Sequence, residues 1–115
     1  MNTIRTGWKI FTHDWRSPLR GGDPLCDGAL PVTLPVVPLD TGPDGCAPGW
    51  SYAATLAQVI PITTVCPDGY SAHACVVKAS ADAIERQGKR RASSLTLVRE
   101  ATWHEWADAL SPLFP

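Results

Sequence analysis

An alternation of apolar and polar residues near the start of the chain predicts a β-strand. The strand covers Ile4–His13, with the sequence IRTGWKIFTH. A period of two places Trp8 and Ile10 on one face, and Lys9 and Phe11 on the other.

The segment from 17 to 49 is rich in Pro and Gly, which predicts extended or loop structure. Within it, Ala29–Leu39 (ALPVTLPVVPL) is apolar but contains three prolines, which donate no hydrogen bond to a sheet. This pattern predicts an edge strand or a polyproline-like segment. Asp40–Ala53 (DTGPDGCAPGWSYA) follows as a turn-rich loop that ends in an aromatic pair.

The second half of the chain alternates helix, strand and turn patterns. The predicted elements are a helix at Ala54–Ile60, a buried strand at Ala72–Ala79, a turn at Gln87 and Gly88, and a strand at Ser93–Glu100 that pairs back after the turn.

The strongest local pattern predicts a C-terminal helix over about residues 102–110. Thr102 and Glu105 have the spacing of a capping box, with Thr102 as the N-cap. The expected apolar stripe of this helix contains Trp103, Trp106, Ala107 and Leu110. We therefore predict one α+β domain over residues 1–115, with a mainly antiparallel sheet and two short helices packed on one side.

Composition and charge indicate which partners and which cellular location to expect. Apolar residues make up 44% of the 115-residue chain, a globular value, and the net charge of −1 argues against nucleic acid. The N-terminus lacks the apolar core of a signal peptide, and no apolar run reaches transmembrane length. We therefore expect a cytoplasmic protein without a membrane partner, and the sequence leaves its oligomeric state open.

Four cysteines, at positions 26, 46, 66 and 75, raise the question of a metal. A structural zinc site begins with two closely spaced ligands, and no such knuckle occurs here. We expect no metal and no cofactor, with the cysteines as buried thiols. His73 lies in a predicted core strand, where a hydrogen-bonded structural role is expected.

Catalytic chemistry has few candidates. His13 and Asp14 follow the first strand and are the candidate acid/base pair, with Cys46 or Ser51 as candidate nucleophiles. No nucleophile-elbow motif accompanies them. The basic run from Lys89 to Arg91 is expected to be solvated, with phosphate contact as the alternative.

Side chains suited to ligand binding gather in two stretches. Arg16 follows the first strand and is suited to gripping an anionic group. Cys46, Trp50 and Tyr52 belong to the turn-rich loop and are candidate ligand-binding residues, with Trp50 and Tyr52 as an aromatic wall. We predict a ligand site between the end of the first strand and this loop.

Over roughly Trp8–Thr102, the chain resembles a family of small uncharacterised domains, some found beside pentapeptide repeats. The matching segments lie between Trp8 and Thr102, and are Trp8–Phe11, Asp14–Arg16, Cys46–Trp50, Leu56–Ile60, Arg90–Ala92 and Leu97–Glu100. Many members have His or Asn and then Ala-Cys after the turn's aromatic residue, where this chain has Ser51, Tyr52 and Ala53. The resemblance implies a compact α+β domain and no established activity.

Three functional hypotheses follow. The first is a small, tryptophan-rich, non-catalytic binding module for a small polar or anionic ligand or for a protein partner. The second is a small metabolic enzyme that uses His13 or Asp14 as acid/base. The third is a zinc-stabilised adaptor.

Overall fold

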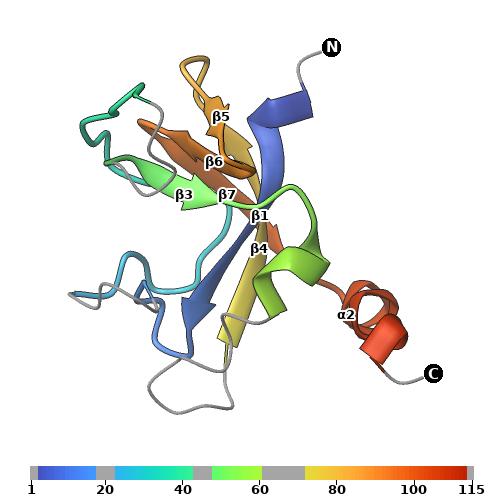
Figure 1. The fold of residues 1–115 in the computed structure, drawn as a ribbon. Helices are drawn as coiled ribbons and strands as arrows, with labels where there is room; N and C mark the ends of the chain where they lie inside the picture. Colours follow the sequence, from blue (N-terminus) through green and yellow to red (C-terminus); the bar gives the residue numbers. More distant parts are fainter. Residues whose placement is uncertain (1–2, 18–22, 43–47, 61–71, 114–115) are drawn as a thin grey trace.

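The computed structural model describes residues 3–17, 23–42, 48–60 and 72–113, and in these ranges the chain forms two antiparallel sheets and one α-helix (Figure 1). The strands are β1 (Thr6–Thr12), β2 (Val32–Thr33), β3 (Trp50–Tyr52), β4 (Ala72–Ala79), β5 (Ile84–Arg86), β6 (Lys89–Ala92) and β7 (Leu95–Glu100). The helix is α2 (Trp103–Leu110), and the 3-10 turns are η1 (Thr3–Arg5), η2 (Leu56–Val59) and η3 (Ser111–Leu113). The predicted α+β character and antiparallel pairing are confirmed.

The larger sheet has the strand order β1-β4-β7-β2. In its register Thr6 lies opposite Lys78 and Thr12 opposite Ala72, so β1 and β4 pair along their full lengths. β4 is central because its apolar side chains serve both faces of the sheet. β2 lies at the edge, which is where the prolines of Ala29–Leu39 predict it.

The smaller sheet has the order β3-β6-β5. Gln87 and Gly88 join β5 to β6 with φ values of 53° and 74°, as a tight hairpin turn with two positive φ angles requires. Lys89–Ala92 follows this turn directly and pairs with β5 as β6. The predicted strand at Ser93–Glu100 pairs back as β7 with β4, and also with β2, so this prediction is confirmed.

The end of the predicted Asp40–Ala53 loop is a strand, β3, which is a correction. Its residues pair with β6, and the next residue, Ala53, exchanges two backbone hydrogen bonds of 2.8 Å with Trp8. Gly7 permits this crossing, because a Cβ at that position would lie 2.3 Å from the carbonyl oxygen of Ala53.

The two faces of the larger sheet carry separate cores. One contains Phe11 and Cys75, both 0% exposed, and extends to residues of the smaller sheet such as Tyr52. The other contains Ile10 and Leu56, with partly buried side chains packed around them. Figure 1 shows η2 and α2 on the same side of the larger sheet, and side chains from both contribute to this second core. The predicted opposite orientation of Ile10 and Phe11 is therefore confirmed.

One of the two predicted helices is confirmed as an α-helix. Thr102 caps α2 with its Oγ1, which accepts from the Glu105 N–H at 3.2 Å, and the Glu105 carboxylate accepts from the Thr102 N–H at 2.9 Å. The segment predicted as a helix at Ala54–Ile60 forms the 3-10 turn η2 in its described part. A single helical turn contains few backbone hydrogen bonds. Its conformation therefore depends on packing and on the Thr55 cap rather than on the helix propensity of its residues.

The apolar stripe predicted for the last helix needs a correction. Trp106 and Ala109 pack against the second core, but Trp103 is 76% exposed. The stripe is rotated relative to the face that meets the sheet, so its leading tryptophan points into solvent.

The Cα radius of gyration is 13.6 Å, the value expected for a compact chain of this length. In the described ranges, none of the helices combines the length and the apolar character needed to span a membrane.

Candidate functional site

The chain turns sharply after β1 in a corner that we call the β1 corner, residues 12–16. Thr12 closes it from both sides, because its N–H donates to the Arg16 carbonyl at 2.9 Å and its carbonyl accepts from the Trp15 N–H at 3.0 Å. The Thr12 hydroxyl donates to the Asp14 carboxylate at 2.5 Å and accepts from the Arg16 N–H at 3.0 Å. The Arg16 Nε then meets the same carboxylate at 2.6 Å.

Trp15 is the structural centre of this corner. Its φ of 64° is unfavourable for a bulky residue, and its side chain is 7% exposed. The indole stacks on the His73 ring with centroids 4.1 Å apart, and its centroid lies 5.6 Å from that of Phe11. Burial of the ring in this stack offsets the cost of the backbone conformation.

His73 links the corner to two other strands. Its Nδ1 pairs with the Glu100 carboxylate on β7, and its Nε2 lies 3.0 Å from the backbone carbonyl of His13. Because both partners accept hydrogen bonds, both ring nitrogens can donate only when the ring is an imidazolium. The hydrogen-bonded structural role predicted for His73 is confirmed.

The predicted acid/base pair is poorly arranged for catalysis. The hydrogen bond from Thr12, assisted by Arg16, holds the pKa of Asp14 below its usual range. A carboxylate with a lowered pKa and two partners is a weak base. The side chain of His13 is exposed, and the His13 backbone carbonyl lies 3.0 Å from the Nε2 of His73.

Tyr52 lies at the far end of β1 from this corner. It is 6% exposed and its hydroxyl donates to the backbone carbonyl of Ile4. β1 spans about 20 Å at the rise of an extended strand. Tyr52 is therefore remote from His13 and Arg16.

Trp50 also lies away from the corner. Its Nε1 donates to the Pro35 carbonyl at 2.7 Å, and the adjacent Leu34 N–H donates to the Leu95 carbonyl at 2.8 Å. Leu95 opens β7 opposite the last residue of β4, whereas His13 follows the last residue of β1, which pairs with the first of β4. The structure thus does not bring the aromatic wall to the first-strand residues. Cys46 lies outside the described residues.

The basic run at residues 89–91 contains a residue that sequence reasoning missed. Arg91 is 1% exposed, and its Nε and Nη2 donate to the carbonyls of Asp40 and Gly42 at 2.8 Å each. The expectation of a solvated side chain is wrong for this residue. Arg91 is buried because the backbone of residues 40 and 42 lies against its guanidinium, whereas Lys89, two residues earlier on β6, is exposed.

Two of the four cysteines are described, and both are free thiols. Cys75 is fully buried, and this burial raises the pKa of its thiol to about 12. Cys75 therefore fits the expected buried thiol, whereas Cys26 is half-buried. Cys46 and Cys66 lie outside the described residues, so the expectation of no zinc stays a prediction.

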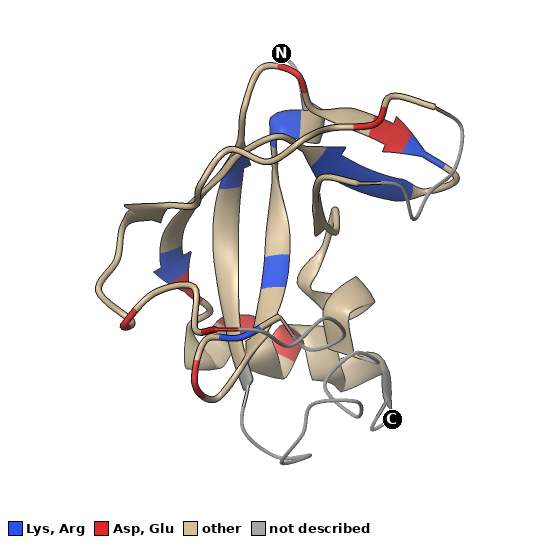
Figure 2. Cartoon of the chain, turned by 90° about the vertical axis from the view of Figure 1, so that its left-hand side faces the viewer, with Lys and Arg blue, Asp and Glu red and all other residues tan. Residues whose placement is uncertain are grey.

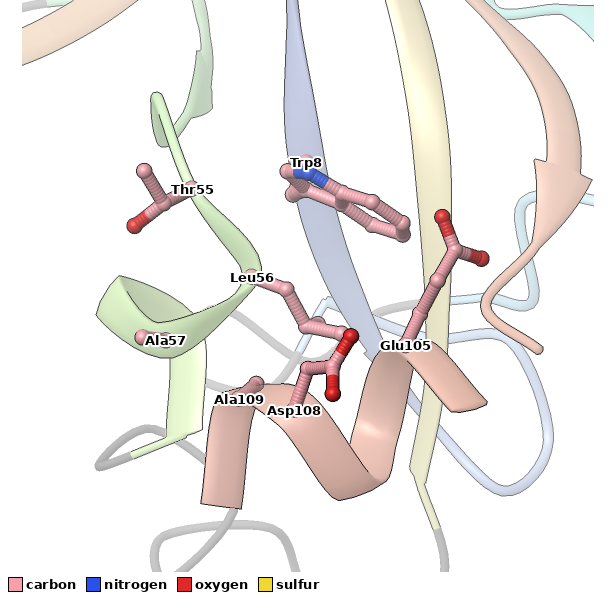
Figure 3. A pocket seen from close by; sticks show the side chains of 7 residues that line it. All are labelled: Trp8, Thr55, Leu56, Ala57, Glu105, Asp108 and Ala109. Atoms are coloured by element: carbon pink, nitrogen blue, oxygen red, sulfur yellow. The ribbon is translucent and has the colours of Figure 1, made fainter. Parts of the chain in front are cut away.

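A concave surface lies between α2, η2 and β1, and we call it the α2 groove. Its volume is about 300 Å³, and it is lined by Trp8, Thr55, Leu56, Ala57, Glu105, Asp108 and Ala109. Figure 3 shows the indole of Trp8 above Leu56, with the carboxylates of Glu105 and Asp108 projecting from α2 on the same side. The groove is open to solvent and has an apolar floor with an acidic edge.

The two carboxylates of the α2 groove differ in their partners. Glu105 forms a two-point ion pair with Arg99, with distances of 2.6 and 3.0 Å. Arg99 and then the Thr102 N–H lower the pKa of Glu105 to about 2, so this carboxylate stays ionised. Among the described residues, no side chain or backbone group bonds to the carboxylate of Asp108, which is exposed. Asp108 therefore supplies an uncompensated negative charge.

The α2 groove was not predicted, although two patterns in the sequence pointed to it. Glu105 and Asp108 are three apart on the predicted helix and therefore share a face. Trp8 lies on the same strand face as Ile10. The sequence did not indicate that η2 packs beside both β1 and α2, and this packing forms the groove.

Charge is distributed unevenly over the molecule. Figure 2 shows Lys and Arg on the strands of both sheets, whereas the Asp and Glu residues of α2 lie at the opposite end of the molecule from the smaller sheet. The acidic α2 groove is thus separate from the basic residues of β5 and β6.

Comparison of the chain with protein-family models, with curated proteins and with solved structures finds no match.

Proposed function

We propose that this chain is a non-catalytic binding domain for a polar molecule or a protein partner, and that the α2 groove is its ligand site. The observation that carries the proposal is the composition of the groove. The half-buried indole of Trp8 and the carboxylate of Asp108 adjoin an apolar floor, a combination typical of recognition sites.

The groove offers little for catalysis. The seven residues that line it include no histidine, cysteine or serine. A carboxylic acid that donates a proton needs a raised pKa, and the pKa of Glu105 is lowered to about 2. Binding without turnover is therefore the better account of this surface.

The alternative enzyme hypothesis depends on His13 and Asp14. The pairing of Asp14 with Thr12 and Arg16 weakens it, because the carboxylate is already occupied. A cytoplasmic location belongs to the proposal, since free thiols such as Cys75 persist in a reducing compartment.

The test is a binding screen with small polar compounds that are cationic, anionic or neutral. Binding to the full chain is detected by chemical-shift changes in two-dimensional NMR spectra. We expect shifts at Trp8, at η2 and at Asp108. Ala57→Trp should abolish them, because Ala57 lines the groove and is exposed. Ala54→Trp, at an exposed position outside the groove lining, is the matched control and should leave binding intact.

Binding that persists in Ala57→Trp, with shifts at the β1 corner instead, would contradict the proposed site. Turnover of a screened compound that is lost in His13→Ala would favour the enzyme hypothesis.

A further inference from the structure

We propose that the α2 groove receives the side chain of a lysine or arginine from a partner protein. This inference rests on the proposed function, and it adds the chemical class of the ligand.

Charge is the first reason. The ionisable residues that line the groove are two carboxylates, and α2 contains no lysine or arginine. Arg99 compensates Glu105, but no described residue bonds to the carboxylate of Asp108. A cation at this edge would be held without displacing an existing partner, whereas an anion would meet an uncompensated carboxylate.

Shape and polarity are the second reason. Lysine and arginine carry a charged head on an apolar stem, and such side chains lay the stem on apolar surface. Leu56, Ala57 and Ala109 supply that surface, and Trp8 supplies an aromatic face that attracts a cation. Figure 3 shows that these groups and the Asp108 carboxylate face one space.

The openness of the groove indicates a side chain on a protein rather than a free small molecule. A site for a small molecule encloses most of its ligand, whereas the α2 groove is open to solvent along one side. A polypeptide brings further contacts from outside the groove. Trp103, in the first turn of the same helix and 76% exposed, offers one of the side-chain types that dominate protein interfaces.

The experiment titrates the full chain with three pentapeptides and follows the Trp8 indole N–H by NMR. The probes are acetyl-Ala-Ala-Xaa-Ala-Ala-amide, in which Xaa is lysine, arginine or norleucine. Norleucine keeps the apolar stem and lacks the charge. We expect the norleucine peptide to bind roughly threefold to fivefold more weakly than the lysine peptide, as for a partly exposed ion pair.

Asp108→Asn should reduce the affinity for the lysine peptide by about the same factor. Asp23→Asn is the matched control, because it removes one charge from an exposed position outside the groove lining and should change nothing. Butylammonium, which is the lysine stem and head without the backbone, should bind more weakly than the lysine peptide.

Equal affinities of the norleucine and lysine peptides, measured at Trp8, would refute recognition of a cation. The α2 groove would then remain a binding site for an apolar side chain. Butylammonium that binds as tightly as the lysine peptide would identify a free amine as the ligand and refute the protein partner. If no peptide moves the Trp8 signal while neutral or anionic compounds do, this inference fails and the proposed function stands. If no compound of any charge moves it, both fail.

Discussion

Replacing the buried Arg91 by methionine tests the role assigned to its guanidinium. Methionine retains an unbranched apolar stem and removes the two hydrogen bonds of 2.8 Å to the carbonyls of Asp40 and Gly42. A hydrogen bond with a charged partner contributes about 1.5–3 kcal/mol, so two such bonds contribute about 3–6 kcal/mol. Asp40 is an exposed residue, so its carbonyl can bind water in the variant. The loss of stability is therefore expected at the lower end of this range. We therefore expect Arg91→Met to lower the free energy of unfolding by about 3 kcal/mol.

The assay is urea unfolding followed by tryptophan fluorescence, with the slope against urea compared between variants to verify that the transition stays two-state. Arg86→Met is the matched control, because the Arg86 guanidinium donates to the carbonyl of the neighbouring Glu85 at 2.9 Å, and its effect should stay within about 0.5 kcal/mol. Arg91→Lys should fall between the two, since it keeps the charge and loses the two-point fork. A loss below about 1 kcal/mol in Arg91→Met, or one equal to that in Arg86→Met, would refute the reasoning.

Three further predictions concern stability and reactivity. Trp106→Ala should cost roughly 2 kcal/mol by chemical unfolding, because Trp106 packs partly buried against the second core. Trp103→Ala, at a position 76% exposed, should lower the free energy of unfolding by less than about 0.5 kcal/mol. Equal losses of stability in the two variants would contradict the different burial of Trp103 and Trp106. The pKa of Glu105 is lowered from 4.5 to about 2, so its ionised form stabilises the fold above pH 4.5, and this contribution is lost as the pH falls toward 2. The stability of wild type and Glu105→Gln should converge over that pH range, and a gap that is constant from pH 5 to pH 2 would contradict the assignment. Cys75, buried and with its pKa raised to about 12, should react with a thiol reagent at pH 8 only as the protein unfolds, and labelling of the native protein as fast as that of the half-buried Cys26 would overturn this.

Local patterns in the sequence determined several elements of the fold. Alternation of apolar residues predicted β1, a short apolar segment predicted the buried strand β4, and the Thr102–Glu105 spacing predicted α2. The prolines of Ala29–Leu39 placed β2 at a sheet edge. Each of these depends on residues a few positions apart, where backbone geometry and missing donors act directly.

Strand partners and the candidate site were decided by the tertiary structure. The sequence of Lys89–Ala92 alone does not show whether these residues are a solvated basic cluster or a strand in which Arg91 is 1% exposed. The burial of Arg91 depends on which other segments of the chain cover it. The α2 groove likewise joins Trp8 to Asp108, residues one hundred positions apart. Side chains that are remote in sequence meet only after the sheets pair and pack. The sequence therefore predicted much of the local structure, while the long-range packing selected which side chains share a surface.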